Sequence, residues 1–193
     1  MEESVHKPEN LSFGDYWPSA GIVGAIFGVI SFAIGLVFGY YQISSEPTGT
    51  MLSPMLLSGV VVCLIIAVAG ALAVWHFAKA VTPYMKLSQG AVIGFLTGAA
   101  IVVTSALLNE IWHMIDPDYT EKLLEAAVAN FEAMDLPSET KDAMIDSTAD
   151  SIRSGSSLGA QLLYGIPMYG ILNLISGMIG AKIFGQKKED ETF

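Results

Sequence analysis

A glutamate and a histidine three residues apart stand at the end of a long apolar run, in the stretch NEIWHMIDPDYTEK at residues 109–122. On a helix this spacing places Glu110 and His113 on one face, where a carboxylate and an imidazole could share a metal ion or move a proton. Asp116 and Asp118 follow on either side of a proline. One interpretation of the stretch is therefore an interfacial zinc or calcium site.

The rest of the sequence argues against catalysis at this stretch. In carboxylate-bridged di-metal bundles the Glu-x-x-His pair occurs twice, together with two further glutamates, whereas here it occurs once beside an apolar run. The other histidine next to an apolar run, His76, is expected about 30 Å away across the membrane, so it cannot share a metal with His113. No Cys-x-x-Cys, His-Glu-x-x-His or phosphate-binding glycine loop occurs. We therefore expect no metal, no cofactor and no enzymatic activity.

Four long apolar stretches determine the fold class. Of the 193 residues, 52% are hydrophobic and only 15% are charged. A helix needs about 20 apolar residues to cross a hydrocarbon core about 30 Å thick. The sequence predicts an all-α membrane protein, organised as a single membrane domain over residues 1–193, whose four transmembrane helices cover about residues 19–41, 52–78, 87–114 and 157–184.

These spans place the Glu110 stretch at a membrane surface. Counted from Leu87, Glu110 lies roughly 35 Å along the helix axis, at the outer interface. Trp112 beside it is typical of the aromatic belt at such an interface. The stretch is better interpreted as the exit of one helix, with Asp116 as the cap of the next helix and Pro117 at its first position.

The connection between the third and fourth spans, about residues 116–155, is too long for a turn. Its apolar residues recur at helical spacing on both sides of a break at Asp135–Pro137, with Ser138 as a second cap, so a helical hairpin is predicted. It carries ten acidic side chains against three basic ones. This charge argues against nucleic acid as a partner. The hairpin is either a solvated element that packs on itself or on the membrane surface, or a docking surface for a basic partner.

The distribution of basic residues predicts the orientation. The first connection lacks lysine and arginine, whereas the second holds Lys79 and Lys86 and the tail holds Lys182, Lys187 and Lys188. The positive-inside rule places both termini in the cytoplasm and the hairpin outside, in the periplasm. The first span is interpreted as a retained helix rather than a signal peptide, because acidic residues dominate the segment before it: Glu2, Glu3, Glu9 and Asp15.

Small residues predict how the spans pack. The first span carries a stripe of them (Gly21, Gly24, Gly28, Ser31, Gly35 and Gly39), as do the third (Gly90, Gly94, Gly98) and the fourth (Gly170, Gly177). Such seams allow close helix contact in lipid, and packing within the chain is favoured over self-association. Asn173, in register with Gly170 and Gly177, is expected to form a hydrogen bond between helices.

The segment LSQGAVIGFLTGAAIVVTSALLNEIWHMIDPDYTEKLLE, the acidic helical connection after it and the closing span that ends in GQKK resemble a family of small bacterial inner-membrane proteins, domain of unknown function 4199. The most specific part is Ile115–Tyr119, IDPDY, directly before a charged helix. The resemblance covers nearly the whole chain. It implies an origin mainly in the Bacteroidetes, four membrane helices and a helical loop between the third and fourth. It implies no activity and no catalytic residues.

The sequence thus predicts a non-enzymatic accessory or scaffold protein of the bacterial inner membrane. Its partners would be the lipid bilayer and another membrane or periplasmic protein, or a second copy of itself, reached through the glycine seams and the acidic hairpin. The alternative is a small-solute transporter or channel. In that case Gln161, Asn173, Thr104 and the kink at Pro167 would line a polar path with Glu110 at its outer mouth.

Overall fold

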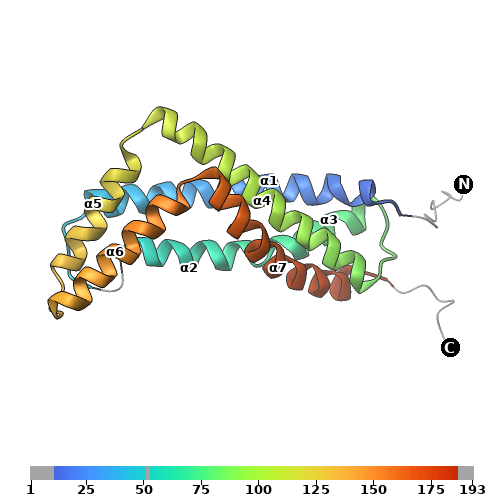
Figure 1. Ribbon diagram of the computed structural model, residues 1–193. Helices are drawn as coiled ribbons and strands as arrows, with labels where there is room; N and C mark the ends of the chain where they lie inside the picture. The colour runs from blue at the N-terminus through green and yellow to red at the C-terminus, as the bar shows by residue number, and fades with distance from the viewer. Residues whose placement is uncertain (1–10, 51–52, 187–193) are drawn as a thin grey trace, which may run out of the picture. The chain divides into compact units, whose positions relative to one another are not determined.

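The computed structural model describes residues 11–50 and 53–186. Over these ranges the chain is helical, in the order α1 (Phe13–Ser44), α2 (Pro54–Ile66), α3 (Ala69–Ala80), α4 (Leu87–Ile115), α5 (Tyr119–Glu132), α6 (Ser138–Gly155) and α7 (Leu158–Phe184) (Figure 1). Four segments are long and apolar enough to cross a membrane: α1, Leu56–Ala80, α4 and α7. The all-α membrane fold with four spanning helices is thus confirmed. Glu2, Glu3, Glu9, Lys187, Lys188 and the first residue of the expected second span lie outside the described residues.

Contacts along the chain define two compact units. The first unit comprises Met1–Phe27, Ile66–Ile101 and Pro167–Phe193, and the second comprises Gly28–Ile65 and Val102–Ile166. The first unit therefore contains α3 with parts of α1, α4 and α7, and the second contains the hairpin of α5 and α6. The expectation of a single membrane domain remains a prediction.

In the first unit, α4 and α7 pack through glycines. A β-carbon added at Gly94 would collide with the backbone carbonyl of Asn173, and one added at Gly90 would come within 2.5 Å of the Ala181 side chain. Gly98 lies against the backbone of Tyr169. Because the two backbones touch, dispersion contacts between them replace the hydrophobic drive that lipid cannot supply. The predicted seam between the third and fourth spans is confirmed as packing within the chain.

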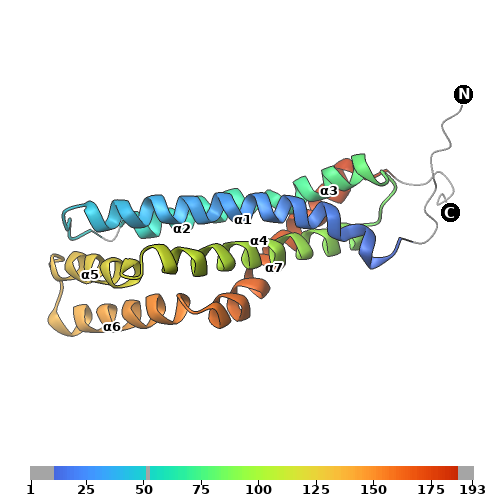
Figure 2. The ribbon, with the colours of Figure 1, turned by 90° about the horizontal axis from the view of Figure 1, so that it is seen from above.

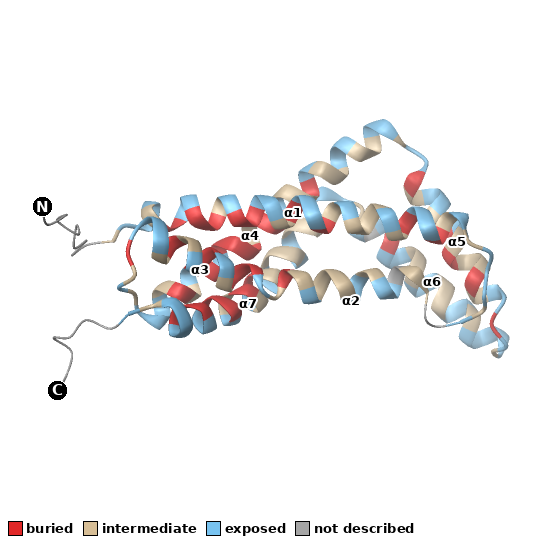
Figure 3. Ribbon diagram, turned by 180° about the vertical axis from the view of Figure 1, so that it is seen from behind, coloured by how far each residue is buried: buried red, intermediate tan, exposed pale blue. Residues whose placement is uncertain are grey.

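The core of the first unit consists mainly of small and branched side chains. On α3 the buried residues are Ala69, Gly70, Ala73, Val74 and Phe77, and burial is dense along the parts of α3, α4 and α7 in this unit (Figure 3). Phe77 is fully buried and its ring lies 5.6 Å from that of Tyr16 on α1. A fully buried aromatic ring is a large part of the core of so small a unit.

The second span is not one uninterrupted helix, which corrects the prediction of a single helix over residues 52–78. Ala67 and Val68 form a turn between α2 and α3. In an uninterrupted helix the N–H groups of Gly70 and Ala71 would donate to carbonyls four residues earlier. They donate instead to side chains of α7, Gly70 to Asn173 Oδ1 at 2.8 Å and Ala71 to Ser176 Oγ at 3.1 Å. Side chains inserted into the ladder of hydrogen bonds interrupt this helix.

In the second unit, α5 and α6 lie side by side as an antiparallel pair (Figures 1 and 2). The apolar residues between them are Leu124, Ala127 and Ile152, with Val128, Phe131 and Ala149 packed around them. The apolar stripe of the hairpin therefore packs on itself, as expected for a solvated helical hairpin. This core makes the hairpin a folded element rather than a loose connection.

The small residues of α1 do not all contact a neighbouring helix. Gly24 packs against Ala100 in the first unit, and the Gly28 carbonyl accepts a hydrogen bond from Ser105 Oγ at 3.0 Å in the second. At Gly21 and Gly35, however, no atom lies within 4 Å of the position that a β-carbon would take. The expectation of one continuous seam along α1 is therefore wrong at these two positions.

Candidate functional site

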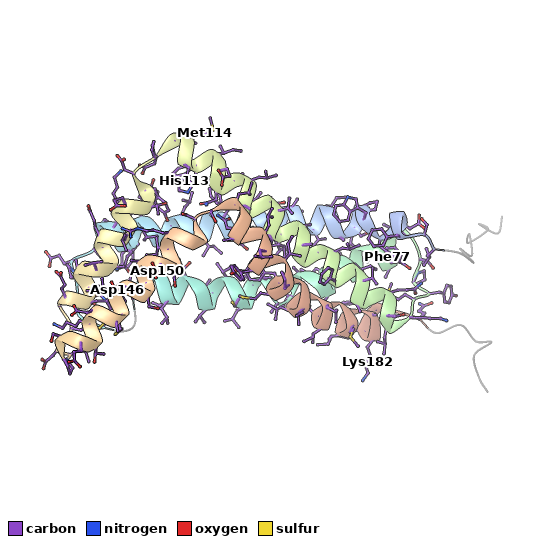
Figure 4. All side chains as sticks on the ribbon, viewed as in Figure 1. Phe77, His113, Met114, Asp146, Asp150 and Lys182 are labelled. Atoms are coloured by element: carbon purple, nitrogen blue, oxygen red, sulfur yellow. The ribbon has the colours of Figure 1, made fainter. Side chains whose placement is uncertain are left out.

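The residues singled out by their chemistry lie at the end of α4, in the second unit. The side chain of Glu110 is exposed, and that of His113, which is labelled in Figure 4, is half-buried. Within residues 11–50 and 53–186, no group of three or more histidine, cysteine or acidic side chains converges as metal ligands would. Glu110, His113, Asp116 and Asp118 therefore do not form a shared site in this arrangement.

Asp116 does not cap the next helix, contrary to the prediction. Helix α5 begins at Tyr119, and Asp118, at its N-cap position, makes no side-chain capping bond. The Asp116 carboxylate instead accepts two hydrogen bonds, from the Tyr40 hydroxyl at 2.7 Å and from Lys122 Nζ at 2.9 Å. Hydrogen bonds from a hydroxyl and an ammonium to a carboxylate are charge-assisted and therefore among the stronger ones.

These contacts, together with burial, shift the pKa values of Asp116, Lys122 and Tyr119, which lie outside the membrane spans. The Tyr40 hydroxyl, followed by the Lys122 ammonium, lowers the pKa of Asp116 because both stabilise the carboxylate. The hydrogen bond to Asp116 raises the pKa of Lys122. Burial raises the pKa of Tyr119, since a phenolate would lose its hydration there. At neutral pH the arrangement is thus an ion pair beside a neutral tyrosine.

An aromatic cluster surrounds this ion pair. The ring of Tyr40 lies 6.1 Å from that of Trp112 and 5.1 Å from that of Tyr119, and Phe32 meets Trp112 edge to face at 6.2 Å. Tyr40 was not among the residues singled out from the sequence. Its bond to Asp116 joins residues 76 positions apart, which no local pattern could reveal. Together the cluster fixes the start of the hairpin against α1.

Asn130 holds the connection after α1 against α5. Its side chain is buried, with 5% of its surface exposed. Oδ1 accepts the N–H groups of Thr48 and Gly49, both at 3.2 Å, while Nδ2 donates to the Thr50 carbonyl at 3.0 Å. Because one amide satisfies three backbone groups of the connection, it replaces the regular structure that this segment lacks.

The outer surface of the hairpin is acidic. Four exposed carboxylates on α6 recur at spacings of three, four and four, which places them on one helix face. We call Glu139, Asp142, Asp146 and Asp150 the α6 acidic face; Asp146 and Asp150 are labelled in Figure 4. Both lysines of the hairpin are directed to other contacts. Lys122 pairs with Asp116, and Lys141 Nζ donates to the Glu132 carbonyl at the end of α5 at 2.9 Å. Lys122 and Lys141 thus do not neutralise this face, and Arg153, three residues after Asp150, is the cation of α6 that lies next to it.

Two of the polar residues proposed for a solute path, Asn173 and Gln161, are engaged in protein contacts. Asn173, in the first unit, is fully buried, with Oδ1 bonded to Gly70 N–H and Nδ2 bonded to the Tyr169 carbonyl at 2.9 Å. The predicted hydrogen bond between helices is confirmed. Gln161, in the second unit, donates to the Ser156 carbonyl at 3.2 Å near the start of α7. The transport alternative remains a prediction, with no observation in its favour.

A protein-family model covers most of the chain. It is described as "Protein of unknown function (DUF4199)" and matches residues 21–182, which contain α2 to α6 and most of α1 and α7. Neither the curated proteins nor the solved structures yielded a match. The chain belongs to the DUF4199 family, and membership in it assigns no reaction and no ligand.

Proposed function

We propose that this protein is a non-enzymatic membrane subunit that holds its acidic hairpin as a docking surface for a basic segment of another protein. The observation that carries the proposal is the α6 acidic face, four exposed carboxylates in one row beside two lysines that are turned to other contacts. A basic helix or extended segment with cations at helical spacing is the complementary partner. Complementary charge would speed its encounter and exclude acidic competitors.

The acidic row is hard to explain by the stability of α6 itself. Like charges four residues apart, such as Asp142 with Asp146, destabilise a helix, and a carboxylate in its C-terminal half opposes the helix dipole. Glu139 in the first turn is the only member of the row that the dipole favours. A partner with positive charge would reverse this repulsion. The unfavourable local charge therefore supports a role in binding.

The attachment of the hairpin supports the same role. Its start is held by the contacts of Asp116 with Tyr40 and Lys122, and its middle by the three bonds of Asn130. A surface that is already ordered loses less conformational entropy when a partner binds. A tethered, unstructured acidic loop would lack this advantage.

The proposal includes an orientation in the bacterial inner membrane, with both termini in the cytoplasm and the hairpin in the periplasm. It rests on Lys79, Lys86 and Lys182 on one side of the spans and on the absence of lysine and arginine from the connection after α1. A Cys63→Ser background removes the only cysteine. In intact cells, a membrane-impermeant maleimide should then label a cysteine at Ser147 and not one at Lys86. The reverse pattern would overturn the orientation.

Site-specific photocrosslinking in the native membrane tests the docking surface. A photoreactive residue replaces Ser147, which is exposed on α6 next to Asp146. The test variant carries Glu139→Gln, Asp142→Asn, Asp146→Asn and Asp150→Asn. The control carries the same loss of four charges on exposed positions at and in α5: Asp118→Asn, Glu121→Gln, Glu125→Gln and Glu132→Gln.

We expect the Ser147 probe to form an adduct with a protein whose crosslinked segment is rich in lysine or arginine. Its yield should fall at least tenfold in the α6 variant, and should also fall as salt concentration rises. The α5 control should retain most of the adduct. Equal yields in the two variants, or an adduct that is insensitive to both charge and salt, would contradict the proposal.

A further inference from the structure

We propose that the second span is a two-state helix, in which α7 decides whether α2 and α3 are separate or joined. In the observed state the N–H groups of Gly70 and Ala71 bind Asn173 Oδ1 and Ser176 Oγ. In the other state these side chains withdraw, and the two N–H groups return to the carbonyls of Ile66 and Ala67. The second span then becomes one continuous helix.

The local sequence does not impose the break. Helix interruptions usually occur at proline, at glycine or serine pairs, or where a side chain or water enters the ladder of hydrogen bonds. The turn itself is Ala67-Val68, and Gly70 lies beyond it in the first turn of α3. Alanine is the strongest helix former and valine is tolerated in a helix. The cause is therefore the two acceptors that α7 supplies.

Val68, the second residue of the turn, already has a helical backbone, with φ −95° and ψ −11°. The Leu72 N–H donates to the Val68 carbonyl at 3.1 Å, so α3 begins directly from this residue. Joining the two helices would therefore change the backbone mainly before Val68. What mainly changes is the acceptor of two N–H groups.

The exchange leaves neither N–H group without an acceptor, and it moves the missing donors from the Ile66 and Ala67 carbonyls to Asn173 Oδ1 and Ser176 Oγ. A buried N–H group without a partner is strongly unfavourable in lipid, so each of these two must always have an acceptor. Asn173 keeps its Nδ2 bond to Tyr169 on its own helix when Oδ1 is released. Two bonds to side chains are replaced by two bonds to backbone carbonyls, and bonds between membrane helices contribute little net stability. The two states are therefore expected to be close in free energy.

The face of α7 that carries the acceptors is built for close approach. Asn173, Ser176, Gly177 and Gly180 recur at helical spacing, and α7 presents this face to α3. A β-carbon at Gly180 would come within 2.8 Å of Ala71 Cα, and Gly70 lies against the backbone of Asn173. No side chain separates the two backbones here. A small displacement of α7 would therefore remove both acceptors together.

Pro167 gives α7 a place at which to bend. A proline inside a helix lacks the N–H that would bond to the carbonyl four residues earlier, here that of Leu163. Asn173 follows Pro167 by less than two turns. Bending at Pro167 would thus shift the two acceptors with little strain in the rest of α7.

NMR spectroscopy of the full chain in detergent micelles or nanodiscs tests the exchange. Relaxation dispersion detects interconversion on the microsecond to millisecond scale. We expect dispersion at the Gly70 and Ala71 amides and at the Asn173 side-chain amide, with one common rate. In Asn173→Leu/Ser176→Ala this dispersion should vanish, and the carbonyl shifts of Ile66 and Ala67 should move to helical values. The control is Thr97→Val, because buried Thr97 bonds only to the Ile93 carbonyl of its own helix.

Ser176→Ala provides a second, milder variant if the double variant does not fold. It removes one acceptor, so the Ala71 amide alone should regain the helical bond to Ala67 while Gly70 keeps Asn173. Absence of dispersion in the native protein would overturn the two-state proposal. Unchanged carbonyl shifts in a folded Ser176→Ala or double variant would overturn the assignment of the break to α7.

Discussion

The two units differ in where their buried residues lie (Figure 3). In the first, burial is concentrated where spanning helices touch, through glycines and a fully buried Phe77. In the second, the hairpin has an apolar core of its own, and none of the described side chains of residues 54–65 is buried. Close backbone packing thus stabilises the first unit, whereas hydrogen bonds and aromatic contacts hold the second around its hairpin. Substitutions in the first should affect folding, and those on the hairpin surface should affect binding.

The largest loss of stability is expected from a substitution at the α4–α7 seam. Gly94→Ala places a methyl group against the Asn173 carbonyl and should lower the free energy of unfolding by about 3 kcal/mol. The matched control is Gly35→Ala in the second unit, where the added carbon meets no atom within 4 Å. The control should be neutral or slightly stabilising, because alanine favours helix over glycine. Unfolding in mixed micelles by titration with denaturing detergent measures both, and equal losses would contradict the contrast between the units.

A smaller loss of stability is expected when Asn130 is replaced. Asn130→Ala leaves the N–H groups of Thr48 and Gly49 and the Thr50 carbonyl without their partner, which should cost about 2 kcal/mol. Hydrogen exchange should accelerate in residues 45–50 and remain unchanged in α3. Simultaneous acceleration in α3 would show that the connection also supports the first unit, and the two units would then not differ in what stabilises them.

The ion pair at the start of the hairpin should give a weaker, pH-dependent effect. The pKa of Asp116 is lowered in the folded protein, so its stabilising contribution is present above the ordinary value of 3.8 and is lost as pH falls through the lowered pKa. Asp116→Asn should remove this dependence at low pH, and Tyr40→Phe should reduce it. Thermal unfolding between about pH 2 and about pH 7 measures the difference. Parallel curves for the native protein and Asp116→Asn would contradict the assignment.

The smallest change in stability is expected for Asp146 on the α6 acidic face. One substitution there should have opposite effects on stability and on binding. Asp146→Asn removes repulsion with Asp142 and Asp150 and should stabilise α6 by about 0.3 kcal/mol. The same change should weaken attachment of a basic partner. Measured stability that falls by more than about 1 kcal/mol would mean that Asp146 has a structural role that the proposed function does not include.

Much of the fold could be predicted from the sequence because membrane spans are long and apolar. The hairpin break at Asp135–Pro137 was also visible, since turn residues separate two segments of helical periodicity. The register of Asn173 with Gly170 and Gly177 correctly placed its amide at a helix contact. These features depend on residues close together in the chain.

The features that the sequence did not reveal depend on distant residues. The bond of Asp116 to Tyr40 joins residues 76 positions apart, and Asp118 rather than Asp116 stands at the N-cap position of α5. The break between α2 and α3 is caused by residues more than 100 positions later, with bonds spanning 103 and 105 positions. Gly21 and Gly35 have the right spacing for a seam, but spacing cannot say whether a neighbour reaches them.

The proposed docking role is tested most sharply by the ratio of Ser147 adduct yields in the α6 variant and the α5 control, measured side by side in native membranes. The two variants lose the same charge, so they differ only in which helix is neutralised. If the α6 acidic face binds the partner, the ratio should be about one tenth or less, the effect of losing roughly 1.4 kcal/mol of binding free energy. A ratio near one, with both variants folded and inserted, would contradict the α6 acidic face as the docking surface.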